Sequence, residues 1–211
     1  MLDGYDRQIN YLRISLTDRC NLRCFYCRGV SDFSFIDHSE ILTYEEFLHL
    51  ARLALKLGVD RFRLTGGEPL VRKGAARFIS QIISLPGVKD VSLTTNGILL
   101  EKYISELKEA GLRRINISLD TLDREKYQKI TGYNGLSQVL SGLELAVRTG
   151  FNPVKVNTVI LRDFNDDRES LSQFMNLTFN WPVHLRFIEL MDFSPVKGLF
   201  VSATEIFKKL K

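Results

Sequence analysis

Stretches in which apolar and polar residues alternate recur along the chain, separated by stretches with apolar residues at helical spacing. Strict alternation is typical of a strand with two different faces, whereas apolar residues three and four positions apart are typical of an amphipathic helix. The alternating stretches predict six strands, at residues 11–17, 61–65, 91–95, 113–120, 153–160 and 183–190.

Helix signals lie between these strands. The clearest is Thr43 with Glu46 three residues later, a capping box that precedes apolar residues at helical spacing and a stop at Gly58. Further helices are predicted after residues 72, 99 and 137, and over residues 123–129 and 166–177. Six strand–helix units with right-handed crossovers predict an α/β protein with a partial (β/α)6 TIM-like barrel, since a full barrel has eight units. No linker rich in Pro, Gly or Ser divides the chain, so we expect one domain over residues 1–211.

The two faces of the predicted sheet differ in character, because one set of alternate strand residues is apolar and the other is polar or basic. A parallel sheet covered on both faces is nearly all apolar, so this pattern predicts apolar faces under the helices and polar faces around a wet, basic cavity. Such a cavity suits a polyanion such as a nucleoside triphosphate, because guanidinium groups bind phosphate bidentately. The alternative is a one-sided sheet whose polar face meets solvent. The polar set comprises Arg13, Ser15, Thr17, Arg61, Arg63, Thr65, Ser92, Thr94, Asn96, Arg114, Asn116, Ser118, Asp120, Lys155 and Asn157.

Composition and charge exclude several classes of protein, but they do not identify the partner or ligand. The chain has 211 residues, 45% hydrophobic and 26% charged, which excludes collagen, low-complexity and disordered chains. Its 29 basic and 25 acidic side chains give a net charge of +4, which suits an anionic small molecule as easily as nucleic acid. No apolar stretch of membrane length and no secretory signal is visible, so we expect a cytoplasmic protein without a membrane or nucleic-acid partner.

All three cysteines, Cys20, Cys24 and Cys27, lie within eight consecutive residues directly after the first predicted strand. An odd, clustered set favours metal chemistry in a reducing cytosol over a disulfide framework. Structural zinc needs four ligands, and neither His38 nor His49 has the spacing of a paired ligand. Three thiolates suit a four-iron cluster with one iron open to a further ligand, and a non-catalytic zinc-binding module is the alternative.

Two motifs carry a family resemblance. The spacing Cys-x3-Cys-x2-Cys, with Tyr26 before the last cysteine, and the run Gly66-Gly67-Glu68-Pro69 resemble the signatures of radical S-adenosylmethionine enzymes. Between residues 11 and 192 the chain resembles, more narrowly, the GTP 3',8-cyclase family of molybdenum cofactor biosynthesis. The segments that carry this likeness are LRISLTDRC at 12–20, RLTGGEPL at 63–70, LTTNG at 93–97, RRINISLD at 113–120, KVN at 155–157 and RFIELM at 186–191.

The resemblance implies two cofactors. One is a 4Fe-4S cluster bound by Cys20, Cys24 and Cys27, and the other is exchangeable S-adenosylmethionine on the open iron. The further cofactor contacts of the family fall on Tyr26, Gly67, Ser118 and Met191.

The resemblance also implies a substrate, because the family's GTP contacts fall on Arg13, Arg63, Thr94 and Lys155, which all belong to the polar set. In the implied reaction an electron donor reduces the cluster, and S-adenosylmethionine is cleaved to a 5'-deoxyadenosyl radical. This radical removes the ribose 3' hydrogen of GTP, which leads to (8S)-3',8-cyclo-7,8-dihydroguanosine 5'-triphosphate. No protein side chain is implied as a catalytic acid or base.

The chain departs from the family pattern in two places. Family members carry a second cysteine triad for another 4Fe-4S cluster, whereas no cysteine follows Cys27 in these 211 residues, so a second cluster is not expected here. The run RGVSDF at 28–33 stands where the family usually has a Met-Pro pair. The resemblance therefore does not by itself imply complete turnover by these residues, and another radical enzyme with a different substrate is an alternative function.

Overall fold

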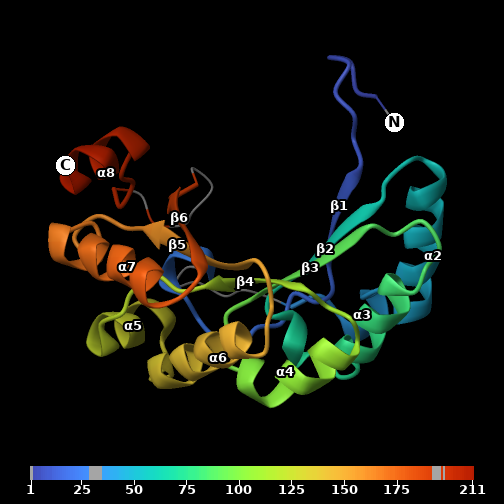
Figure 1. Ribbon diagram of the computed structural model, residues 1–211, viewed down its shortest axis with the longest axis horizontal. Coiled ribbons are helices and arrows are strands. Elements are labelled where there is room, and N and C mark those ends of the chain that lie inside the picture. The colour runs from blue at the N-terminus through green and yellow to red at the C-terminus, as the bar shows by residue number, and fades with distance from the viewer. Residues whose placement is uncertain (1, 29–34, 192–195, 197) are drawn as a thin grey trace.

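The computed structural model describes residues 2–28, 35–191, 196 and 198–211. Its six strands form one parallel sheet in which they stand in chain order (Figure 1). All six predicted strands are present, so the α/β fold class and the partial barrel are confirmed in the form of an open sheet. The strands are β1 (Tyr11–Ser15), β2 (Arg61–Thr65), β3 (Asp90–Thr95), β4 (Arg114–Ser118), β5 (Val154–Ile160) and β6 (Val183–Glu189).

Helices connect the strands and begin and end close to where the sequence predicts. At the start of α2, the Thr43 hydroxyl accepts a hydrogen bond from the Glu46 amide and the Glu46 carboxylate accepts one from the Thr43 amide, which confirms the predicted capping box. No helix in the described ranges is long and apolar enough to cross a membrane. The helices are α1 (Phe25–Arg28), α2 (Tyr44–Lys56), α3 (Ala75–Ile83), α4 (Leu100–Glu109), α5 (Arg124–Thr131), α6 (Leu136–Arg148), α7 (Arg168–Asn180) and α8 (Ala203–Leu210), with 3-10 turns η1 (His38–Glu40) and η2 (Pro69–Val71).

The apolar face of the sheet is buried under the helices. Phe62 and Leu64 on β2, and Ile115 and Ile117 on β4, are fully buried in one continuous core with the inner faces of the helices. Figure 1 shows the connecting helices along this side of the sheet. Burial of each such side chain contributes roughly 1.5–3 kcal/mol to stability. The opposite face carries Arg13, Arg63 and Lys155, which are exposed or partly buried, so the predicted division between the two faces is confirmed.

The sheet is open, because within the described residues β1 pairs only with β2 and β6 pairs only with β5. An arm precedes β1 and extends away from the helices, with an antiparallel bridge between Leu2 and Gln8 (Figure 1). Since all six strands are parallel, their carboxyl ends lie along one edge of the sheet, which is where barrels of this kind carry their active sites.

Two local features differ from the sequence-based expectation. The helix α1 and the 3-10 turns are too short to give a periodic signal, so the alternation does not predict them. Asp166 lies just before α7 instead of within it, where its carboxylate accepts a hydrogen bond from the Asp163 amide and pairs with Lys209 of α8. Asp167 is the residue that caps α7. Residues 29–33, which depart from the family pattern, lie outside the described residues.

Candidate functional site

The three cysteines lie on the segment that leaves β1 at the carboxyl edge of the sheet. Cys20 and Cys24 are partly buried, and Cys27 is exposed on α1 with its amide 3.0 Å from the Cys24 carbonyl oxygen. Burial raises the pKa of the Cys24 thiol, and the nearby charges of Asp120, Cys20 and Cys27 raise it further. A metal that binds this thiol must therefore displace its proton.

Hydrogen-bond donors point at the sulfur of Cys20. The amide of Leu22 lies 3.4 Å from this sulfur, and the side-chain amide nitrogen of Asn96 lies 3.6 Å from it. Donors of this kind stabilise a thiolate and tune an iron–sulfur cluster. Over the described ranges no three His, Cys, Asp or Glu side chains converge as for a single metal ion. In a four-iron cluster each iron takes its own ligand, so the three thiols need not converge on one atom, and the donor set fits such a cluster.

The glycine turn after β2 holds the backbone that leads to the cysteines. The Gly67 amide donates to the Thr17 carbonyl oxygen at 2.6 Å, and the Glu68 amide donates to the Arg19 carbonyl oxygen at 2.8 Å. A Cβ on Gly67 would lie 2.3 Å from the Arg19 oxygen, and one on Gly66 would lie 2.5 Å from the Thr17 oxygen. Both glycines are therefore required for the close approach of two backbone segments, a reason that the motif alone does not reveal.

Glu68 is the buried centre of this turn. Its carboxylate accepts hydrogen bonds from the Leu70 amide at 3.1 Å, the Thr95 hydroxyl at 2.8 Å and the Asn96 amide at 2.6 Å. Burial raises the pKa of Glu68 to about 7, although the three donors favour the charged form. The carboxylate joins the turn after β2 to the end of β3, from which Asn96 reaches the sulfur of Cys20.

The raised pKa of Glu68 predicts a pH dependence of stability. The folded chain keeps this proton up to about pH 7, whereas the unfolded chain releases it near the usual glutamate pKa of 4.5. The free energy of unfolding is therefore expected to fall by roughly 3 kcal/mol from this group as the pH rises through that interval, and to level off above it. Urea unfolding of the purified chain between about pH 4.5 and pH 8 measures the slope. Glu68→Gln is expected to remove this contribution and to leave the slope that Asp120, whose pKa is raised to about 6, adds at lower pH. Glu106→Gln, on the exposed side of α4, is the matched control. Equal slopes in the wild type and Glu68→Gln would contradict the prediction.

Tyr26 is fixed from the opposite side by a buried carboxylate. Its hydroxyl donates to Asp120 Oδ2 at 2.6 Å, and Asp120 Oδ1 accepts from the Val159 amide at 2.9 Å. Burial raises the pKa of Asp120 to about 6 and raises the pKa of Tyr26 well above its usual value. The side-chain amide of Asn165 donates to the Asp120 carbonyl oxygen. Asp120 thereby ties the cysteine segment to the ends of β4 and β5. In the sequence, the membership of Asp120 in the polar set was the only signal for this role.

An apolar cavity of about 220 Å³ opens beside the cysteine segment. Tyr26 and Met191, two of the expected S-adenosylmethionine contacts, both line it. Ser118 is the last residue of β4 and Gly67 lies in the turn after β2, so these two lie at the same carboxyl edge without belonging to the lining. The other lining residues are Cys27, Val159, Ile188, Glu189 and Leu190.

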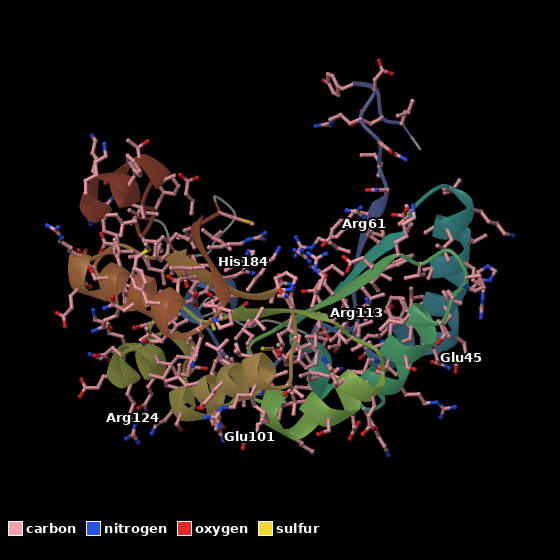
Figure 2. The ribbon with its side chains drawn as sticks, viewed as in Figure 1. Glu45, Arg61, Glu101, Arg113, Arg124 and His184 are labelled. Atoms are coloured by element: carbon pink, nitrogen blue, oxygen red, sulfur yellow. The ribbon has the colours of Figure 1, made fainter. Side chains whose placement is uncertain are left out.

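The expected GTP contacts stand in two neighbouring rows across the polar face. Arg13 is in register with Arg63, and Thr94 and Lys155 are both in register with Asn116. Figure 2 shows His184 on this open side, whereas Glu101 and Arg124 project from helices on the other side. His184 is in register with Lys155, so it lies on the functional face and not among the helices.

Arg114 and Arg186 are further cations on the same face. The sequence analysis included Arg114 in the polar set and Arg186 in the segment RFIELM, without assigning either to the substrate. Burial lowers the pKa of Arg63, and the charges of Arg13, Arg186 and Arg114 lower it further. Burial also lowers the pKa of Lys155, with further lowering by Arg186, Arg114 and Arg63. The cations therefore repel one another, and an anion bound among them relieves that repulsion.

A sequence model of the Radical SAM superfamily matches residues 14–175, which include the end of β1, the cysteine segment, the glycine turn and β2 to β5. The chain therefore belongs to the radical SAM superfamily, whose cofactors are a 4Fe-4S cluster and S-adenosylmethionine. Among its relatives are GTP 3',8-cyclases. That of Heliobacterium modesticaldum is 45% identical and matches 100% of this chain and 65% of its own length. That of Moorella thermoacetica is 49% identical and matches 98% of this chain and 64% of its own length. The chain thus spans about two thirds of the length of these relatives.

Solved structures show the same fold. A radical SAM methyltransferase from Sphaerobacter thermophilus has a TM-score of 0.74 at 17% identity, over 94% of this chain and 61% of that protein. The protein anSMEcpe, solved with bound AdoMet, has a TM-score of 0.72 at 20% identity, over 94% of this chain and 57% of that protein. These likenesses confirm the architecture, while the arrangement of the site rests on this chain's own residues.

Proposed function

We propose that this chain acts in a radical enzyme of the GTP 3',8-cyclase type, in molybdenum cofactor biosynthesis, with residues 1–211 forming one radical SAM core domain. The observation that carries the proposal is the cationic polar face, which leads directly to the cysteine segment at the carboxyl edge of the sheet. A polyanion bound among the cations would place its other end beside the cofactors. The likeness to GTP 3',8-cyclases supports GTP as that polyanion.

The residues divide between the two ligands. Cys20, Cys24 and Cys27 would hold the cluster, and the hydrogen bonds to Cys20 favour its thiolate form. Tyr26 and Met191 would contact S-adenosylmethionine from the apolar cavity, and Gly67 and Ser118 from the strand ends. The GTP phosphates would be bound by Arg13, Arg63, Thr94 and Lys155.

The chain's contribution is position and exclusion of water. When bound, the reduced cluster and S-adenosylmethionine supply a radical that removes a hydrogen atom from the substrate, with the electron coming from a separate donor. The strand cations fix the phosphates, so the sugar is held toward the carboxyl edge. Val159 and Ile188 make that region apolar and shield the reacting groups from water. Orientation of this kind accounts for a large part of the rate in reactions between bound partners.

Nucleotide binding tests this proposal. Isothermal titration calorimetry is expected to show GTP binding that weakens as salt rises, because partly exposed charges are screened. Lys155→Ala is expected to lower the affinity by about 10- to 100-fold, the effect of one charge-assisted hydrogen bond. ATP is expected to bind almost as well as GTP, since the assigned contacts recognise phosphates and not the base.

Lys102→Ala is the matched control, because it removes the same charge from an exposed position on α4. Its GTP affinity is expected to match that of the wild type. Unchanged binding by Lys155→Ala, or a strong preference for GTP over ATP, would show that the substrate is not held by the strand cations.

A further inference from the structure

An ion pair stands on the polar face at the amino-terminal ends of β3 and β4. Arg114 Nη1 lies 2.5 Å from Asp90 Oδ2, and the two side chains are 31% and 21% exposed. Among the alternate residues of the described strands that form this face, Asp90 is the only carboxylate, whereas the positive charge comes from Arg13, Arg61, Arg63, Arg114, Lys155 and Arg186. The acidic partner is therefore an exception on a surface that otherwise attracts anions.

Asp90 uses only part of the hydrogen-bonding capacity of Arg114. A guanidinium carries five N–H groups, and the hydrogen bond to Asp90 Oδ2 is donated by Nη1. The Nε atom of Arg114 is buried and has no hydrogen-bond partner among the described residues. A buried cationic donor without an acceptor is destabilising. Phosphate oxygens are acceptors that match the planar, forked arrangement of N–H donors in a guanidinium.

Arg114 lies at the amino-terminal end of β4, far from the carboxyl edge of the sheet where the cysteine segment lies. Arg114 shares a row with Ser92, which is in register with Arg63 and, through it, with Arg13. The row of Lys155 lies two residues closer to the carboxyl ends, or about 7 Å along the strands. A nucleotide whose sugar lies at the carboxyl edge extends its phosphates past Lys155 toward Arg114.

We propose that Arg114 binds the terminal phosphate of the nucleoside triphosphate, and that Asp90 is a positioning residue that holds the Arg114 guanidinium in place. This inference rests on the proposed function, because it takes the triphosphate as the ligand. Asp90 holds the Nη1 group of Arg114, and the exposed part of the guanidinium is thereby presented to the substrate without a further loss of side-chain freedom. The pair thereby distinguishes a triphosphate from a diphosphate.

Calorimetric titrations with GTP and GDP test both roles. Arg114→Met is expected to weaken GTP binding by about 10- to 100-fold and GDP binding by less than about threefold. Arg114→Lys keeps the charge without the planar fork, and an intermediate loss for GTP is expected. Thermal unfolding of each variant shows that it is folded at the titration temperature.

Asp90→Asn tests positioning through the sign of its effect. Removal of a negative charge from an anion site strengthens binding if charge alone matters. If Asp90 positions Arg114, Asp90→Asn instead weakens GTP binding by about three- to tenfold. Glu144→Gln is the matched control, because Glu144 pairs with Arg148 within α6, away from the strand cations, and its loss changes the net charge equally. Its GTP affinity is expected to stay within about twofold of the wild type.

Each outcome separates this inference from the proposed function. Equal losses for GTP and GDP in Arg114→Met overturn the assignment to the terminal phosphate. Tighter or unchanged GTP binding by Asp90→Asn overturns its positioning role. If Lys155→Ala weakens GTP binding and Arg114→Met does not, the inference fails and the proposed function stands. If the wild type binds neither nucleotide, both fail.

Discussion

A chain with Gly67→Ala is expected to take up no iron–sulfur cluster and to lose about 3 kcal/mol or more of stability. The added Cβ would lie 2.3 Å from the carbonyl oxygen and 2.6 Å from the carbonyl carbon of Arg19, so the turn and the segment before Cys20 must separate. That separation breaks the two main-chain hydrogen bonds that position the cysteine segment. Iron analysis after anaerobic reconstitution and urea unfolding measure the two effects.

Gly4→Ala is the matched control for this substitution. A Cβ at Gly4 would meet no atom within 4 Å, so both iron content and unfolding free energy are expected to remain at the wild-type level. Wild-type iron content in Gly67→Ala would show that the cysteine segment keeps its position without the close backbone approach.

Anaerobic reconstitution of the wild-type chain is expected to give about four irons per chain, the content of one cubane. Replacement of Cys20, Cys24 or Cys27 by alanine is expected to abolish iron uptake, since the chain has no other cysteine to substitute as a ligand. Iron analysis and the visible absorption of the cluster measure the result.

Arg23→Ala is a control within the same segment, because it leaves all three thiols and the Arg23 main-chain bond to Thr131 in place. It is expected to load iron normally. Stoichiometric zinc in protein purified without oxygen, together with no iron uptake on reconstitution, would contradict the cluster assignment.

The elements of the fold were predictable because their signals are local. The Thr43–Glu46 capping box lies within four residues, and the alternation in β2 or β5 is repeated within five to seven residues. The division of the strands into apolar and polar sets is equally local, and it was sufficient to predict the basic face that includes Arg13 and Lys155.

The pairings within the site were not predictable because they join distant segments. Tyr26 and Asp120 are 94 positions apart, and Asn96 and Cys20 are 76 positions apart. The contact of Arg114 with Asp90 depends on the register of two neighbouring strands, which the sequence of either strand does not specify. The glycine turn could be recognised as a motif, but the backbone it approaches became apparent only in three dimensions.

The sequential order of the strands has a consequence for how the protein acquires its cofactor. Every sheet contact joins a strand to the next one along the chain, so the sheet can grow by stepwise addition. The longest of these crossovers joins β1 to β2, and a longer loop is entropically costlier to close. We expect β1 to dock late onto a preformed β2–β6 sheet. The glycine turn can form its main-chain hydrogen bonds to the cysteine segment only after that docking. Cluster insertion is therefore expected to be a late maturation event instead of the nucleus of folding.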